Sequence, residues 1–190
     1  MDEFAPGPGP YDFEEVEPVG SFIDFGHLLL PTPPTDLKVS LECEENTGKG
    51  MAVTLESDAF TLQVSVFSAT KSGGEWNEVM QQLEQSIAAQ GGQTRRDHSA
   101  LGLTLYVATP TVNEDGSTAT KEMRVLGFEG NRWFLRGLLT GAAVNDLVLA
   151  TEAEALFRSW IVRRGDSPMP PLELLELSRP PQTPPPLRNF

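Results

Sequence analysis

Apolar and polar residues alternate along several stretches of this chain, which is the pattern of strands that bury one face. Residues 37–43 begin the pattern, and residues 51–55 and 60–66 repeat it after short turn sequences. Three such strands joined by tight turns predict an antiparallel meander. Further strands are expected at residues 103–107, 121–128 and 132–139, with weaker signals at 94–98 and 161–163.

Two helices interrupt the strands. Residues 71–92 hold the first, between glycine pairs at 73–74 and 91–92, and Ser72 followed by Glu75 has the spacing of a capping box. Its apolar side chains recur every three to four residues and so share one helix face: Trp76, Val79, Met80, Leu83 and Ile87. A second helix is expected to begin near Asn145 or Thr151, with a similar stripe formed by Leu149, Ala153, Leu156, Phe157 and Trp160.

This succession gives the order β-β-β-α-β-β-β-α. Hairpin-linked strands interrupted by two helices predict an α+β fold, with a mainly antiparallel sheet and two helices packed on it. We expect this domain to span residues 37–166. Residues 1–19 are acidic and rich in Pro and Gly, which predicts a disordered head, and residues 167–190 are expected to be a proline-rich tail.

An apolar segment, residues 20–36, lies between the head and the domain. It contains Phe22, Phe25 and Leu28 and ends in a cluster of prolines. One interpretation, which we favour, is that it packs back onto the edge of the domain. The other is that it is a linear motif that docks into a partner protein.

Charge is distributed unevenly along the chain. The formal net charge is −13, and residues 1–36 contribute eight acidic side chains and no lysine or arginine. This acidity disfavours nucleic acid as a partner, because such binding depends on neutralising phosphates. No apolar run is long enough for a transmembrane helix, and the acidic N-terminus lacks the apolar core of a secretory signal. The sequence therefore predicts a cytoplasmic protein outside the membrane.

Motifs for catalysis and for metal binding are not found in the sequence. His27 and His98 do not have metal-ligand spacing, and Cys43 is the only cysteine, so we expect no metal site. The glycines at 73–74 could seat an anion at a helix N-terminus, but phosphate-binding patterns are absent, which favours a tight turn. Without a nucleophile motif we expect neither an enzyme nor a cofactor.

The strand at residues 132–139 carries the most unusual side chains. Arg132, Phe134 and Arg136 would share one face of it. Two arginines flanking an aromatic ring can bind an anion or an acidic peptide. The favoured alternative is a central strand whose arginines pair with carboxylates of the helices. In a third interpretation they hold the acidic head, which then acts as an autoinhibitory flap.

Several segments carry a resemblance to a known family: residues 9–12, 24–31, 72–76, 90–92, 132–137 and 162–169. Over roughly residues 9–170 the chain resembles an actinobacterial family known as a conserved domain of unknown function. That resemblance implies no activity. The order of strands and helices is also similar to the Mog1/PsbP-type αβα sandwich, which implies a fold used mostly for protein binding.

The sequence thus predicts a non-enzymatic protein-binding or adaptor domain. The expected binding residues are Phe22, Phe25 and Leu28 of the apolar segment and Arg132, Phe134 and Arg136 of the strand. A small-molecule or anion-binding domain and a structural homo-oligomer remain as alternatives.

Overall fold

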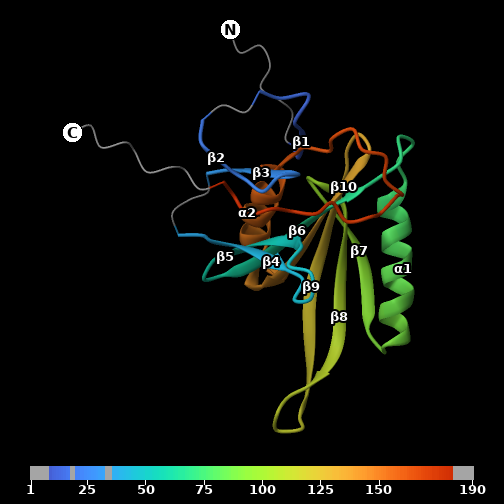
Figure 1. Ribbon diagram of the computed structural model, residues 1–190. Helices are drawn as coiled ribbons and strands as arrows, with labels where there is room; N and C mark the ends of the chain where they lie inside the picture. The colour runs from blue at the N-terminus through green and yellow to red at the C-terminus, as the bar shows by residue number, and fades with distance from the viewer. Residues whose placement is uncertain (1–8, 18–19, 33–35, 182–190) are drawn as a thin grey trace, which may run out of the picture.

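The computed structural model describes residues 9–17, 20–32 and 36–181, and its centre is a seven-stranded sheet. The strand order is β4-β5-β6-β10-β9-β8-β7, and every neighbouring pair is antiparallel. The hairpin of β8 and β9 projects beyond the other strands (Figure 1). The strands are β4 (Lys38–Cys43), β5 (Gly50–Glu56), β6 (Phe60–Ser68), β7 (Gln93–Ser99), β8 (Gly102–Val112), β9 (Thr118–Glu129) and β10 (Trp133–Gly141).

Two helices pack on opposite faces of this sheet and over different strands. Helix α1 (Glu75–Ala89) lies over β7, β8 and β9, where Trp76 and Met80 pack on Leu105, Val125 and other apolar side chains. Helix α2 (Leu147–Arg158) follows a 3₁₀ turn, η1 (Ala142–Val144), and packs over β6 and β10. Each helix thus leaves part of its own sheet face open.

The predicted fold class is confirmed, since two helices accompany mainly antiparallel strands. The weak signal at residues 94–98 is a full strand, β7, so four strands rather than three separate the helices. The predicted stripe of α1 also packs on the sheet. Alternation along the chain is therefore a sufficient guide to the large sheet.

The predicted capping box of α1 is wrong. The helix begins at Glu75, after two glycines with positive φ, Gly73 at 73° and Gly74 at 98°. The Glu75 carboxylate accepts the Thr70 N–H at 2.6 Å rather than reaching the Ser72 amide, and the Trp76 N–H donates to the Glu129 carboxylate at 2.7 Å. A tight glycine turn and a carboxylate from β9 together position the helix start.

A second, four-stranded sheet covers part of the core. Its order is β1-β11-β3-β2, from β1 (Tyr11–Asp12), β11 (Ile161–Val162), β3 (Leu28–Pro31) and β2 (Phe22–Asp24). Residues 11–12 belong to the head that the sequence predicts to be disordered, yet they pair in parallel with β11. Predictions for residues 1–8, 18–19 and 33–35, and for the proline-rich tail at 182–190, lie outside the described residues.

The chain after β11 also packs on the domain, so the predicted boundary at residue 166 is not where the packing ends. Residues 167–181 (red in Figure 1) run back to the large sheet. The Leu175 N–H donates to the Val66 carbonyl and the Leu177 N–H to the Gly50 carbonyl, each at 2.9 Å. Both leucine side chains are buried in the core. Backbone pairing and two apolar anchors thus extend the folded unit.

If this segment is part of the core, Leu175→Ala should lower the free energy of unfolding by about 2–5 kcal/mol, because it leaves a cavity. The matched control is Leu147→Ala, whose side chain is 83% exposed and which should change stability by less than about 0.5 kcal/mol. Urea unfolding followed by tryptophan fluorescence measures both. Equal, small effects would place residues 167–181 outside the folded unit.

Candidate functional site

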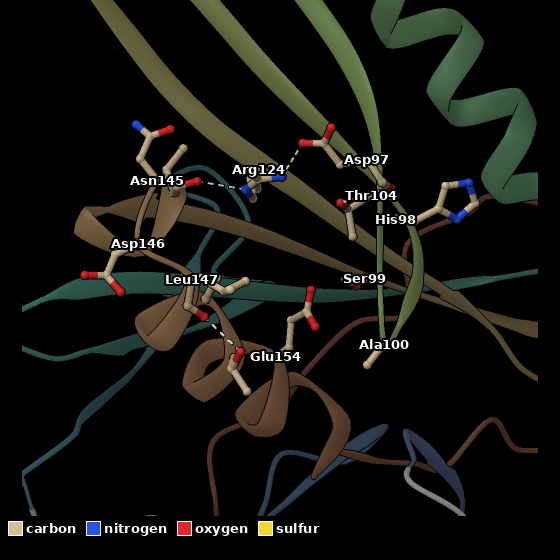
Figure 2. Close-up of a pocket in the computed structure, with 13 residues that line it drawn as sticks. Asp97, His98, Ser99, Ala100, Thr104, Arg124, Asn145, Asp146, Leu147 and Glu154 are labelled. Carbon is tan, nitrogen blue, oxygen red and sulfur yellow. Dashed lines mark hydrogen bonds and ion pairs between the residues drawn. The ribbon is translucent and has the colours of Figure 1, made fainter.

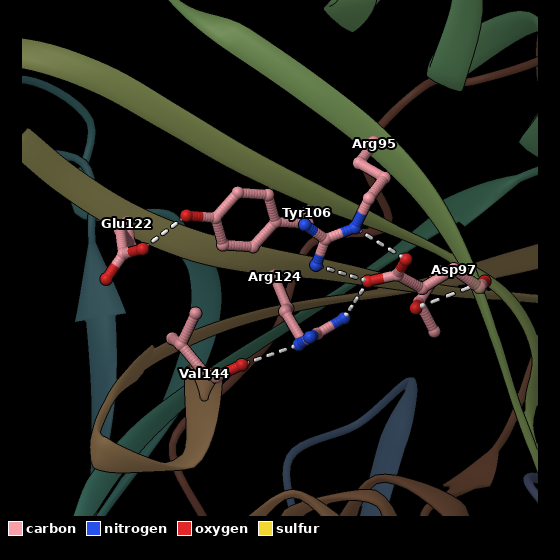
Figure 3. A network of polar contacts seen from close by, with 7 residues as sticks. Arg95, Asp97, Tyr106, Glu122, Arg124 and Val144 are labelled. Carbon is pink, nitrogen blue, oxygen red and sulfur yellow. Dashed lines mark hydrogen bonds and ion pairs between the residues drawn. The ribbon is translucent and has the colours of Figure 1, made fainter. Parts of the chain in front are cut away.

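Helix α2 packs on one face of the large sheet but covers only part of it. The uncovered part of this face carries polar side chains from three adjacent strands. Successive residues of a strand point to opposite faces, so residues directly paired across strands share a face. Tyr106 of β8 is paired with Arg95 of β7 and with Arg124 of β9, and Thr104 with Asp97. The same alternation places Glu122 of β9 on this face. Figure 3 shows these side chains together. We call them the tyrosine face.

Two arginines of the tyrosine face converge on one carboxylate. Arg95 Nε lies 2.8 Å from Asp97 Oδ1, and Arg124 Nη1 lies 2.7 Å from Asp97 Oδ2. Arg124 Nε also donates to the Val144 carbonyl at 2.8 Å, which ties the network to η1. Since both oxygens of Asp97 and two edges of Arg124 are engaged, the network holds the side chains in fixed positions.

Tyr106 occupies the centre of the network. The guanidinium carbon of Arg95 lies 4.6 Å from its ring centroid and that of Arg124 lies 5.8 Å away, both within cation–π range. The Tyr106 hydroxyl donates to the Glu122 carboxylate, whose other oxygen accepts from the Asn145 amide at 2.9 Å. The ring is therefore fixed both at its face and at its hydroxyl.

These contacts shift the pKa values of Asp97 and Tyr106. Hydrogen bonds from Arg95 and Arg124 lower the pKa of Asp97 to about 2 against the opposing effect of its partial burial. The hydrogen bond to Glu122 raises the pKa of Tyr106 above its usual value of 10.0. Near neutral pH Asp97 is ionised and Tyr106 is neutral, and because the pKa of Asp97 lies far below 7 and that of Tyr106 far above it, both are poorly matched to proton transfer at that pH.

A cleft of about 420 Å³ lies between the tyrosine face and the first turns of α2 (Figure 2). Its walls carry acidic groups, Asp97, Asp146 and Glu154, and the basic Arg124, whose guanidinium is already paired. Asp146 caps α2 by accepting the Val148 and Leu149 amides. Next to the cleft, Leu147 is 83% exposed and Val148 is 69% exposed. Two apolar side chains, Leu147 and Val148, are thus exposed to solvent beside the cleft that Asp97 and Arg124 line.

Groups of three or more His, Cys, Asp and Glu positioned to hold a metal ion are not present among the described residues. His98 lines the cleft, whereas His27 lies elsewhere, with Nδ1 2.6 Å from the Arg163 carbonyl. Cys43 is a free, partly exposed cysteine of the edge strand β4. Within the same residues no helix meets the length and apolarity that crossing a membrane requires.

The predicted docking segment is built into the fold. Phe25 is 3% exposed and its ring lies 6.2 Å from that of Trp160, and Leu28 is completely buried. Only Phe22, at 37% exposure on β2, remains at the surface. Residues 20–32 of this segment therefore pack onto the domain, as in the interpretation that we favoured.

Of the three residues predicted to share a strand face, Phe134 and Arg136 do so, whereas Arg132 lies outside the strand. Arg132 precedes β10, has φ of 64° and donates to the Gly165 carbonyl at 3.3 Å. Phe134 is buried against Trp76, with ring centroids 5.6 Å apart. Arg136 lies on the same side as Phe134, 5.0 Å from the Phe67 ring. Neither arginine forms an ion pair with a carboxylate of the described residues.

The described part of the acidic head is held by a tryptophan, not by these arginines. Trp133 Nε1 donates to the Asp12 carboxylate at 2.9 Å. Arg163, which sequence reasoning did not single out, lies 4.5 Å from the Phe13 ring and pairs with Asp24 at 3.3 Å. Binding in cis therefore occurs, but through a different set of side chains from the one predicted.

Sequence reasoning missed the tyrosine face altogether. Its members are the polar halves of the alternating patterns that predict β7, β8 and β9. Polar residues on the outer face of a strand usually contact water, so the pattern alone gave no reason to single them out. The signal that could have found them is the gathering of arginine, aspartate and tyrosine on paired strands.

Comparison with known proteins identifies the family. A family described as "Protein of unknown function (DUF3710)" matches residues 9–185, and the chain belongs to it. No curated protein and no solved structure gives a match. The predicted membership of a family of unknown function is confirmed, whereas the actinobacterial origin and the similarity to the Mog1/PsbP sandwich stay predictions.

Because of this network, the free energy of unfolding should decrease as the pH falls below 4. The pKa of Asp97 is about 2 in the folded chain and 3.8 ordinarily, so its ion pairs stabilise the fold above pH 4 and are lost between pH 4 and pH 2. Asp97→Asn should therefore reduce the free energy of unfolding by about 1–2 kcal/mol at pH 7 and by progressively less at pH 4 and pH 2.5. Urea titrations at these pH values measure the difference. A difference that stays constant with pH would show that Asp97 is not held by the arginines.

Proposed function

We propose that this protein is a non-catalytic protein-binding domain, and that its partner docks on the tyrosine face and the exposed first turn of α2. The observation that carries the proposal is the exposure of Leu147 and Val148 beside a cleft that is lined by Asp97 and Arg124 of the tyrosine face. Exposed apolar side chains near an arginine, with a tyrosine beside that arginine on the same sheet face, have the composition of a protein-interface hot spot.

Preorganisation supports this role. Binding loses free energy when side chains become ordered at an interface, by about 0.5–1.5 kcal/mol for each flexible side chain. Arg124, Asp97 and Tyr106 are each fixed by at least two contacts before a partner arrives. A partner therefore meets a surface whose polar side chains need little further ordering.

The other predicted classes receive less support at this site. A small anion would meet a cleft with three carboxylates and with an Arg124 guanidinium that is already paired. A homo-oligomer formed through an uncovered apolar sheet face is not supported here, because this open face is polar. The net charge of −13 argues against nucleic acid. A polypeptide with apolar and mixed-charge groups fits the surface best.

The experiment compares proteins captured in vivo. The intact tagged chain, expressed and crosslinked in its natural host, should capture a defined set of proteins, quantified by mass spectrometry. In the double variant Leu147→Ala/Val148→Ala, and in Arg95→Ala, capture of at least one abundant member should fall about tenfold, because each removes interface contacts without disturbing the core.

Two variants serve as controls. Lys49→Ala removes one exposed positive charge, as Arg95→Ala does, but from the turn between β4 and β5. Phe22→Ala removes an exposed apolar side chain of the small sheet. Both should retain full capture. Loss of capture by Phe22→Ala with no effect of the α2 variant would assign binding to the small sheet and would contradict the proposal.

A further inference from the structure

The opposite face of the large sheet carries a second open site, independent of the tyrosine face. There, a groove of about 350 Å³ runs between α1, strands β6 and β10, and the segment after β11. Its walls are mostly apolar: Phe67, Val79, Leu83, Phe134 and Leu172. The one charged side chain that lines it is Arg136, and the remaining lining residues are uncharged.

The charge of Arg136 is not compensated within the described part of the chain. Its Nε is buried without a hydrogen-bond partner, and no described carboxylate pairs with its guanidinium. The guanidinium instead lies over the Phe67 ring, 5.0 Å from the centroid. Burial lowers the pKa of Arg136 below its ordinary value, yet an arginine side chain stays protonated at neutral pH. A partly buried cation with an unused donor favours an anion close to it.

Leu172, which forms the wall of the groove opposite α1, has an unusual backbone conformation. Leu172 has φ of 60°, which is rare for a bulky residue without a turn-forming side chain. Its N–H donates to the Ser68 carbonyl at 2.8 Å, and the hydroxyl of Ser68 donates to the Pro170 carbonyl. These bonds fix the backbone so that the Leu172 side chain joins the apolar cluster under α1. The strain is maintained at the position that completes the groove.

We infer that this groove binds an aliphatic monocarboxylate, with its carboxylate on the Arg136 guanidinium and its chain between α1 and Leu172. A single uncompensated arginine matches one negative charge, and the walls match a hydrocarbon chain. Phosphate groups fit less well, because a second cation is missing from the lining. Since the groove has a volume of only about 350 Å³, the occupant is a small molecule rather than a partner helix.

The test uses decanoate below its micelle concentration, with the full chain. Isothermal titration should give saturable binding, and amide chemical shifts in NMR spectra should change around Phe67, Val79, Arg136 and Leu172. Decanol, which has the same chain without the charge, should bind at least about tenfold more weakly, as expected for the loss of a charge-assisted hydrogen bond. Equal affinities, or shifts centred elsewhere, would overturn the proposal.

A pair of charge-removing variants sharpens the test. Arg136→Gln should weaken decanoate binding at least about tenfold and leave decanol binding unchanged, whereas Arg95→Gln, on the other sheet face, should leave both unchanged. Equal decanoate binding by Arg136→Gln and the wild type would overturn the assignment. If Arg136→Gln does not fold, the comparison of decanoate with decanol on the wild-type chain still decides it.

Discussion

The pairing of β10 with β6 is the contact on which the rest of the structure depends. It joins nine residues of each strand, from Trp133 opposite Ser68 to Gly141 opposite Phe60, and it unites two meanders into one sheet. Because β7 forms the far edge, α1 must cross one face of the second meander to reach it. Helix α2, which follows β10 after the short turn η1, packs on the other face. The two open half-faces are a direct result of this arrangement.

Close approach between helix and sheet fixes this geometry further. A Cβ atom on Gly127 would lie 2.4 Å from the Trp76 ring, and one on Gly137 would lie 2.9 Å from the Phe157 ring. Each helix therefore rests an aromatic side chain directly on the backbone of a central strand. Such contacts leave little freedom for the helices to slide, so the edges of both the tyrosine face and the Arg136 groove are well determined.

Sequence patterns predict the large sheet because alternation and helical periodicity are local properties. The small sheet mostly escapes them, since only β11 gives a weak signal, at residues 161–163, and β1 and β11 are two residues each and pair across about 150 residues of chain. Local composition likewise suggested that residues near Leu175 form a tail, although backbone bonds to β6 and two buried leucines attach them. The position of Arg136 on a strand was predictable, but the lack of a carboxylate partner among the described residues depends on where α1 and the segment after β11 lie.

The measurement that tests the central claim most directly is hydrogen–deuterium exchange of the chain alone and in complex with its captured partner. Our account predicts slower exchange on binding in β7, which pairs with the strand of Tyr106, and in residues 142–151, which contain Leu147. Slower exchange confined to β2 and β3, with β7 and α2 unchanged, would contradict it, because binding would then involve the small sheet instead of the open face of the large one.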